Sequence, residues 1–269
     1  MKLEQSFVPQ RPIYRLGVCD SGVGGLSILH ALIPLGIPEY VYVADTANVP
    51  YGDRSPEEIQ QLSIKLIEFL LTFQVDAVVI ACYTMCSVAL NVLRMRFPKT
   101  TFIEIIDGTI SQAAACTKNN RIGVIATKAT VNSGLFASKF RLSHPDGEIF
   151  ERACPQLVPL IEQHPMDHAC LEHVLKMSLT PLIVRAVDTL VLGCTHFILI
   201  QSLIKKIMGS QVAVVHAQQP VRRMVEGLLP QGYHTVAPPR IQMYVTGNKE
   251  TFFDPYQLVT NPHIHQVSL

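Results

Sequence analysis

VDAVVIACYT, at residues 75–84, and VDTLVLGCTH, at residues 187–196, are the two stretches that decide the fold. Each begins with Val-Asp and a variable residue, continues as an apolar run, and ends in a small residue followed by cysteine. The two cysteines, Cys82 and Cys194, lie 112 residues apart (194 − 82 = 112). Two runs with shared flanks indicate an internal repeat of domain length.

A second pair of similar segments supports the repeat. The sequence RLGV at residues 15–18 resembles RIGV at residues 121–124, at an offset of 106 (121 − 15 = 106). Each half of the chain would therefore open with a short apolar strand and reach its cysteine roughly seventy residues later (82 − 15 = 67 and 194 − 121 = 73).

Short apolar runs alternate with helical patterns throughout the chain. Strands are expected at residues 14–19, 40–44, 77–81, 102–106, 122–126, 148–153, 189–192, 212–215 and 241–245. Helices are expected at residues 26–35, 55–73, 87–97, 111–117, 133–140, 167–186 and 197–208, with one more after residue 220. The clearest helix start is Ser55-Pro56-Glu57-Glu58, which combines a capping box with proline at the first helical position.

This alternation is typical of parallel sheets covered by helices. The sequence therefore predicts an α/β fold with two pseudo-symmetric α/β domains whose mainly parallel sheets face one cleft. The first predicted domain comprises residues 1–107 and 217–269 and carries Cys82. The second comprises residues 108–216 and carries Cys194.

The composition excludes several classes of protein. With 48% hydrophobic and 16% charged residues, the chain is not disordered. A net charge of +1 without a basic block argues against nucleic acid as a partner. Seven scattered cysteines favour reduced thiols over a disulfide framework. The polar start at residues 1–12, expected to be a loose arm, and the lack of a long apolar run predict a cytoplasmic protein that does not bind membranes.

Polar or nucleophilic residues follow the predicted strands where a parallel sheet presents its carboxyl ends. In open α/β sheets ligands bind beyond those ends. Two halves that face each other would bring these residues around one cleft, and they are Asp20, Asp45, Cys82, Thr127 and Cys194.

Two thiols on opposite sides of an α-carbon can invert its configuration. One thiolate removes the α-proton from one face, and the other thiol returns a proton to the opposite face. No metal or pyridoxal cofactor is needed if charge and hydrogen bonds stabilise the carbanion.

Six segments then carry a resemblance to a known family. They are DSGVGG (20–25), DTANVPYG (45–52), ACYT (81–84), IGVIATKATVNSG (122–134), ACPQLVPLIE (153–162) and LVLGCTH (190–196). In this order and spacing the chain resembles the cofactor-independent glutamate racemases from about Leu16 to Val245.

The resemblance implies a racemase that interconverts L- and D-glutamate without a cofactor and supplies D-glutamate for peptidoglycan. Cys82 and Cys194 would be the catalytic acid/base thiols, with Asp20 assisting Cys82 or contacting the substrate ammonium, and His196 assisting Cys194. The implied substrate-binding residues are Asp20, Ser21, Tyr51, Gly52, Tyr83, Thr84, Thr130, Thr195 and His196. A homodimer is one expected assembly.

The chain departs from the family after its first catalytic cysteine. Tyr83 stands where the family usually has Asn, and Met85 and Cys86 replace small residues. If Tyr83 points into the site, it crowds the ligand or replaces a carboxylate contact. If it points away, a donor is lost. Residues 105–109 also match the family's Pro-Gly hinge poorly.

Other interpretations stay open at this point. Cys82, Cys86, Cys194 and His196 could hold zinc, and the DSGVGG turn with Asp45 could bind a dinucleotide. Asp45 could also orient the Tyr51 loop without touching substrate. The function could instead be racemisation of another acidic amino acid such as aspartate, or ligand binding and regulation with weak turnover.

Overall fold

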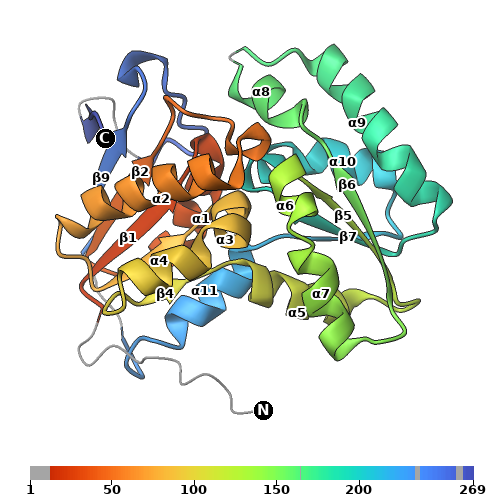
Figure 1. Cartoon of the computed structure of the whole chain (residues 1–269), viewed down its shortest axis with the longest axis horizontal. Helices are drawn as coiled ribbons and strands as arrows, with labels where there is room; N and C mark the ends of the chain where they lie inside the picture. Colours follow the sequence, from red (N-terminus) through yellow and green to blue (C-terminus); the bar gives the residue numbers. More distant parts are fainter. Residues whose placement is uncertain (1–12, 164, 234–236, 259–262) are drawn as a thin grey trace.

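Two parallel sheets organise the protein, and each carries one of the repeated cysteine stretches (Figure 1). The computed structural model describes residues 13–163, 165–233, 237–258 and 263–269. In this part of the chain every pair of neighbouring strands is parallel. The predicted α/β fold with mainly parallel sheets is confirmed. The arm predicted at residues 1–12 lies outside the described residues.

The first sheet has the strand order β10-β9-β2-β1-β3-β4. Its strands are β1 (Arg15–Asp20), β2 (Glu39–Ala44), β3 (Ala77–Ile80), β4 (Phe102–Ile103), β9 (Arg240–Val245) and β10 (Ile264–Gln266). The second sheet has the order β6-β5-β7-β8. Its strands are β5 (Arg121–Ala126), β6 (Glu148–Ala153), β7 (Thr189–Gly193) and β8 (Ala213–Val215).

The internal repeat is visible in the strand order and in the register. The order β2-β1-β3-β4 of the first sheet recurs as β6-β5-β7-β8 in the second. Gly17 is paired with Val78 in one sheet, and Gly123 with Leu190 in the other. These are corresponding positions of the repeated segments, so the two halves have the same local arrangement.

The repeated Val-Asp pairs also have a structural explanation. The carboxylate of Asp76 accepts hydrogen bonds from the backbone N–H groups of Tyr14 and Arg15, before β1. The carboxylate of Asp188 accepts them from Lys118 and Asn119, before β5. Each aspartate therefore fixes the start of the first strand in its own half.

Helices cover the sheets, and several begin where the sequence predicts. They are α1 (Leu26–Leu32), α2 (Pro56–Leu71), α3 (Tyr83–Val88), α4 (Leu90–Arg96), α5 (Ile106–Cys116), α6 (Lys128–Asn132), α7 (Leu135–Ser143), α8 (Leu157–Glu162), α9 (His168–Val184), α10 (Gln201–Met208) and α11 (Gln218–Glu226). The 3-10 helices are η1 (Val23–Gly25), η2 (Ile33–Leu35), η3 (Tyr51–Asp53), η4 (Thr195–Ile200) and η5 (Lys249–Thr251). Ser55 and Glu58 form the predicted capping box of α2, and Asp167 caps α9.

The central strands are buried because helices cover both sheets. All six residues of β2 are buried, as are all four of β3 and all five of β7. Such strands read as continuous apolar runs in the sequence. Among the described residues, no helix is both long enough and apolar enough to cross a membrane.

Some predicted boundaries are wrong for local reasons. A helix begins at Tyr83, directly after Cys82, whereas residue 87 was expected. The strand expected at 102–106 ends at Ile103, because the Glu104 carboxylate accepts the N–H groups of Ile106 and Asp107 and starts α5 there. The sequence analysis also missed α8 and β10.

The domain boundaries stay a prediction. The first sheet is built from residues 15–103 and 240–266, and the second from residues 121–215. Helix α5 runs through the predicted boundary at 107 and 108.

Candidate active site

A narrow cavity lies where the carboxyl ends of the two sheets meet. The volume that it leaves open to the centres of water molecules is about 10 Å³. Its walls are Ser21, Pro50, Tyr51, Gly52, Cys82, Tyr83, Thr84, Thr127, Val158, Cys194, Thr195 and His196. Residues from both halves of the chain therefore enclose one polar space.

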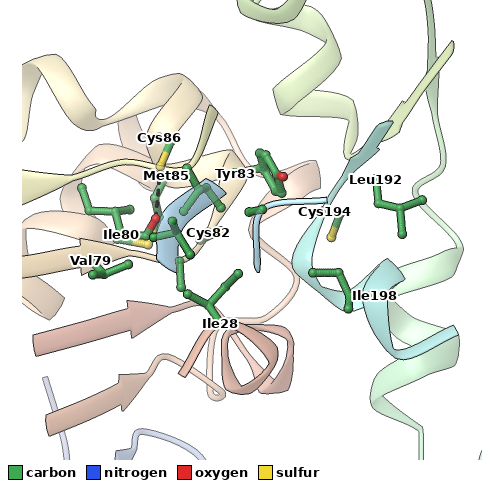
Figure 2. Packing of buried hydrophobic residues seen from close by; sticks show 14 of the residues in the cluster. Ile28, Val79, Ile80, Cys82, Tyr83, Met85, Cys86, Leu192, Cys194 and Ile198 are labelled. Carbon is green, nitrogen blue, oxygen red and sulfur yellow. Dashed lines mark hydrogen bonds between the residues drawn. The ribbon is translucent and has the colours of Figure 1, made fainter. Parts of the chain in front are cut away.

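Cys82 and Cys194 line this cavity from opposite sheets. Cys82 follows β3 and precedes α3, and Cys194 follows β7 and precedes η4, as Figure 2 shows. Both side chains are buried. The Oγ of Ser21 lies 3.7 Å from the sulfur of Cys82, and Nδ1 of His196 lies 3.8 Å from the sulfur of Cys194. Each thiol thus has a polar neighbour of a different kind.

The surroundings of Cys82 disfavour its thiolate in the absence of ligand. Burial, together with the nearby charge of Asp20, raises the pKa of the Cys82 thiol to about 12. The N–H of Met85 opposes this effect. A cationic group placed next to Cys82 would therefore be needed to favour its ionisation.

Asp20 lies behind the cavity wall and links the two halves. One carboxylate oxygen accepts a hydrogen bond of 2.8 Å from the N–H of Gly22, and the other accepts one of 2.9 Å from the hydroxyl of Thr195. Burial raises the pKa of the Asp20 carboxyl to about 6, although the charge of His196 and these hydrogen bonds oppose the rise. The carboxylate is thus positioned between the two thiol sites.

His196 forms an ion pair with Glu162. Nε2 of His196 lies 2.6 Å from Oε1 of Glu162, which also accepts the N–H of Val23 at 3.0 Å. Burial opposes a charged imidazole, but the contacts with Cys194 and Glu162 outweigh it and raise the pKa of His196 well above its usual value. The pKa of Glu162 is lowered because the contact with His196 outweighs its burial. A positively charged imidazolium therefore lies beside the Cys194 thiol.

Three threonines form a hydroxyl cluster across the cavity. The Thr84 hydroxyl, from α3, lies 2.9 Å from that of Thr127 and 3.3 Å from that of Thr130. Thr127 caps α6 and donates to Thr130 at 2.9 Å. Hydroxyl groups both donate and accept, so this cluster can turn its protons toward a carboxylate.

Asp45 is held away from the cavity and orients the Tyr51 loop. The Tyr51 hydroxyl donates to Oδ2 of Asp45 at 2.7 Å, and Asn48 and Thr246 also donate to this carboxylate. The structure therefore favours the orienting role of Asp45 over direct contact with a ligand. Dinucleotide binding would need the Asp45 carboxylate to accept hydrogen bonds from a ribose, but Tyr51, Asn48 and Thr246 already donate to it.

The hydroxyl of Tyr83 is directed toward α5. It lies 2.9 Å from the hydroxyl of Thr109, and the ring centroid lies 5.7 Å from that of Phe136 (Figure 2 shows Tyr83 beside the two cysteines). The residue still forms part of the cavity wall. Tyr83 thus narrows the site while its hydroxyl is used in packing.

This arrangement predicts a mild phenotype for Tyr83→Phe. The variant loses one buried hydrogen bond, so the free energy of unfolding should fall by about 1 kcal/mol in denaturant titrations, with racemisation close to wild type. Thr109→Val is the matched variant, and its cost should be smaller in the Tyr83→Phe background. A large loss of activity at unchanged stability would instead place the hydroxyl on the substrate.

The structure brings together most of the predicted site residues. Those in the cavity wall are Ser21, Tyr51, Gly52, Cys82, Tyr83, Thr84, Cys194, Thr195 and His196. Asp20 and Thr130 lie one layer behind it and touch wall residues. The Cys86 thiol points to the carbonyl of Ile80, and among the described residues no group of three or more Cys, His, Asp and Glu side chains is arranged to hold a metal ion.

Sequence reasoning missed Glu162, which ends the segment at 153–162. It placed Thr127 at the cleft but gave it no role in binding. An acid at the end of a short apolar helix was the available signal for Glu162. Its role depends on contact with His196, which is 34 residues away in the sequence.

Comparison with known proteins gives a consistent result. A family model described as Asp/Glu/Hydantoin racemase matches residues 27–220. A glutamate racemase of Neisseria meningitidis serogroup A is 39% identical over 226 residues, which are 82% of this chain and 83% of that protein. Glutamate racemase 2 of Caldanaerobacter subterraneus subsp. tengcongensis is 36% identical over 261 residues, 96% of both chains. The crystal structure of glutamate racemase from Francisella tularensis in complex with D-glutamate has a TM-score of 0.83 at 29% identity, covering 94% of this chain and 97% of that one.

Proposed function

The chain belongs to the Asp/Glu/hydantoin racemase family, and from this premise we propose that it is a glutamate racemase that uses Cys82 and Cys194 as its two bases. The observation that carries this proposal is the single cavity that both thiols line from opposite sheets. A two-base inversion requires one acid/base group on each side of the reacting carbon.

The proposed reaction moves two protons with no net loss. A thiolate on one side takes the proton from Cα, and the carbanion receives a proton from the thiol on the other side. The bond from Cα to hydrogen breaks on one face and forms on the opposite face, which inverts the configuration. The two cysteines then hold exchanged protonation states and must reset before the same enantiomer can react again.

The neighbours of the thiols have distinct roles in this scheme. The imidazolium of His196, held by Glu162, would assist proton transfer at Cys194. On the other side, the substrate ammonium would offset the charge of Asp20 and so favour ionisation of Cys82. The hydroxyls of Thr84 and Thr127 would bind substrate carboxylates.

Glutamate is the proposed substrate because the similar proteins above are glutamate racemases. Aspartate is the second candidate, because Tyr83 is a bulky residue in the cavity wall and would suit a shorter side chain. Circular dichroism of reactions started from each enantiomer of glutamate and aspartate separates the two. Turnover of aspartate alone would contradict the first proposal. No α-proton exchange in deuterium oxide with either amino acid would favour a binding protein.

The biological setting is part of the same proposal. A glutamate racemase in the cytoplasm would supply D-glutamate for peptidoglycan, and the gene should restore growth of a bacterium that requires D-glutamate.

Activity should persist after treatment with a chelator, since the scheme uses neither metal nor pyridoxal. Light scattering tests the predicted homodimer.

The pKa of Asp20 predicts the acid limb of the rate profile. Burial raises this pKa to about 6, so the carboxylate takes up a proton as the pH falls through that value. The value of kcat/KM should therefore fall below about pH 6, because the protonated acid no longer attracts the substrate ammonium. In Asp20→Asn the rate should be lower at pH 8 and the limb near pH 6 should be absent. An unchanged limb in this variant would assign it to another group.

A further inference from the structure

The cavity in this structure is too narrow for a substrate. About 10 Å³ is open to the centres of water molecules, which is enough for roughly one water. An amino acid with two carboxylates needs far more space. The segments that enclose the cavity must therefore separate before substrate enters, and the following inference rests on the proposed function for the identity of that substrate.

One side of the enclosure is held by charged groups, and we call it the acid seam. It consists of the contacts from Asp20 to Thr195 at 2.9 Å, from Glu162 to His196 at 2.6 Å, and from Glu162 to the N–H of Val23 at 3.0 Å. The contacts of Asp20 with Thr195 and of Glu162 with Val23 join the two halves across the cavity, whereas Glu162 and His196 belong to the same half. Hydrogen bonds to charged groups are worth roughly twice those between neutral groups.

The opposite side is held by neutral groups, and we call it the threonine seam. It consists of the hydroxyl contacts from Thr84 to Thr127 and Thr130, together with the backbone of Gly52 against Thr127. A Cβ on Gly52 would lie 2.5 Å from the Cβ of Thr127, so the contact is close but apolar. The threonine seam is thus the weaker of the two and should separate first.

The pockets outside the two seams differ in size and charge. Outside the threonine seam lies a pocket of about 600 Å³, which shares Gly52 with the catalytic cavity. Polar side chains dominate its lining, which is Gly52, Asp53, Arg54, Ser55, Pro56, Gln60, Ser87, Val88, Lys128, Ala129, Asn132 and Ser133. Outside the acid seam lies a pocket of about 230 Å³ that contains the carboxylate of Glu162. The lining of the first pocket carries two basic side chains and one acidic one, whereas the charged residue that lines the second, Glu162, is paired with His196.

Lys128 is the main source of positive charge at the first pocket. Its side chain is exposed and follows Thr127 directly. Arg54 also lines the pocket, but its guanidinium is held by the carbonyl of Asn48 and lies 4.0 Å from Glu58. Asp53 offsets part of the positive charge. The positive electrostatic potential at the pocket therefore comes mainly from Lys128.

We propose that the substrate enters and leaves through the threonine seam and the pocket of about 600 Å³ outside it, which we call the outer polar pocket. We propose further that Lys128 attracts the substrate to this pocket. The route makes Lys128 a positioning residue for an anionic amino acid. A change at Lys128 should therefore alter the rate at which the substrate reaches the cavity, while the rate of proton transfer stays the same.

Alkylation of the cavity thiols tests the route without relying on turnover. Iodoacetate carries a negative charge and iodoacetamide carries none, and mass spectrometry of the peptides with Cys82 and Cys194 reports each rate. Lys128→Glu should slow iodoacetate relative to iodoacetamide by about fivefold at low ionic strength, from Coulomb's law in water for a two-unit charge change roughly 8 Å from the path. The effect should shrink as salt is added.

Lys249→Glu is the matched control. Lys249 lies in η5, next to residues that line the pocket outside the acid seam. It should leave the ratio of the two rates unchanged. The route would be overturned if Lys249→Glu lowered the rate with iodoacetate relative to iodoacetamide, or if Lys128→Glu left this relative rate unchanged.

A steric pair of variants and the racemase assay complete the test. Asn132→Trp narrows the outer polar pocket and should slow both reagents, whereas Thr251→Trp at the other pocket should slow neither. If the wild-type protein racemises glutamate, Lys128→Glu should lower kcat/KM about fivefold with kcat unchanged. If it does not, the proposed function fails, and the alkylation rates still decide the route.

Discussion

Cys82→Ser and Cys194→Ser are each expected to lower kcat/KM for racemisation by about 10³-fold or more in both directions. A serine hydroxyl is close to a thiol in size, so the packing of the cavity wall is preserved. Its pKa is far above that of a thiol, so neither the base nor the acid of the two-proton scheme remains on the substituted side. Circular dichroism of reactions started from L- and D-glutamate measures the loss.

The single variants should still exchange one proton. Cys82→Ser retains Cys194 with its His196–Glu162 pair, and Cys194→Ser retains Cys82 near Ser21 and Asp20. Each variant should therefore exchange the α-proton of one enantiomer with deuterium oxide, and the two variants should act on opposite enantiomers. Proton NMR of the recovered amino acid gives this result directly.

Cys170→Ser provides the control, because Cys170 is exposed and does not line the cavity. It should leave racemisation unchanged. Full racemisation by either cavity variant would show that the missing thiol is not a base. Exchange of the same enantiomer by both variants would place the two sulfurs on one face of the carbon.

The repeat explains why so much of the fold could be predicted from the sequence. The two Val-Asp stretches have the same order of residue types and the same place in their sheets, so each supports the assignment of the other. The predicted strand at 102–106 failed because Glu104 uses its side chain to start a helix, which the apolar pattern of its neighbours conceals.

From local pattern alone, the site was predictable where its residues lie next to a strand end, and Tyr51 and Gly52 followed from the family resemblance. Cys82, Cys194 and His196 belong to local segments with a recognisable pattern. The partner of His196 is set by packing within the second half, and the contact between Asp20 and Thr195, which are 175 residues apart, is set by how the two halves face each other. Local sequence carries no information on such a contact.

Tyr83 shows the same limit in a single residue. The sequence left its direction open, because a tyrosine after Cys82 could point into the site or away from it. The position of Thr109 on α5 decides the direction of its hydroxyl. That helix begins five residues earlier than its sequence pattern indicates, at Ile106 where residue 111 was expected.

Gly24→Ala is expected to lower kcat/KM by about 10²-fold while the protein remains folded. A Cβ on Gly24 would lie 2.6 Å from the backbone nitrogen of His196 and 2.7 Å from the Thr195 hydroxyl. The backbone of η4 cannot yield as a flexible side chain would, so Thr195 and His196 must shift away from η1. That shift disturbs the contacts of Thr195 with Asp20 and of His196 with Glu162, and it displaces the groups that serve Cys194.

Gly227→Ala is the matched control for this prediction. A Cβ on Gly227 would meet its nearest neighbours, two carbonyl oxygens of the preceding turn, at 3.4 and 3.6 Å, which is ordinary contact. Both variants should keep the far-ultraviolet circular dichroism of the wild type, and only Gly24→Ala should lose activity. Wild-type kcat/KM in Gly24→Ala would mean that the halves can separate by the width of a methyl group without misplacing the thiol at Cys194. The requirement for a closely fitted cavity would then fail, since the proposed reaction depends on both sulfurs being held against one carbon.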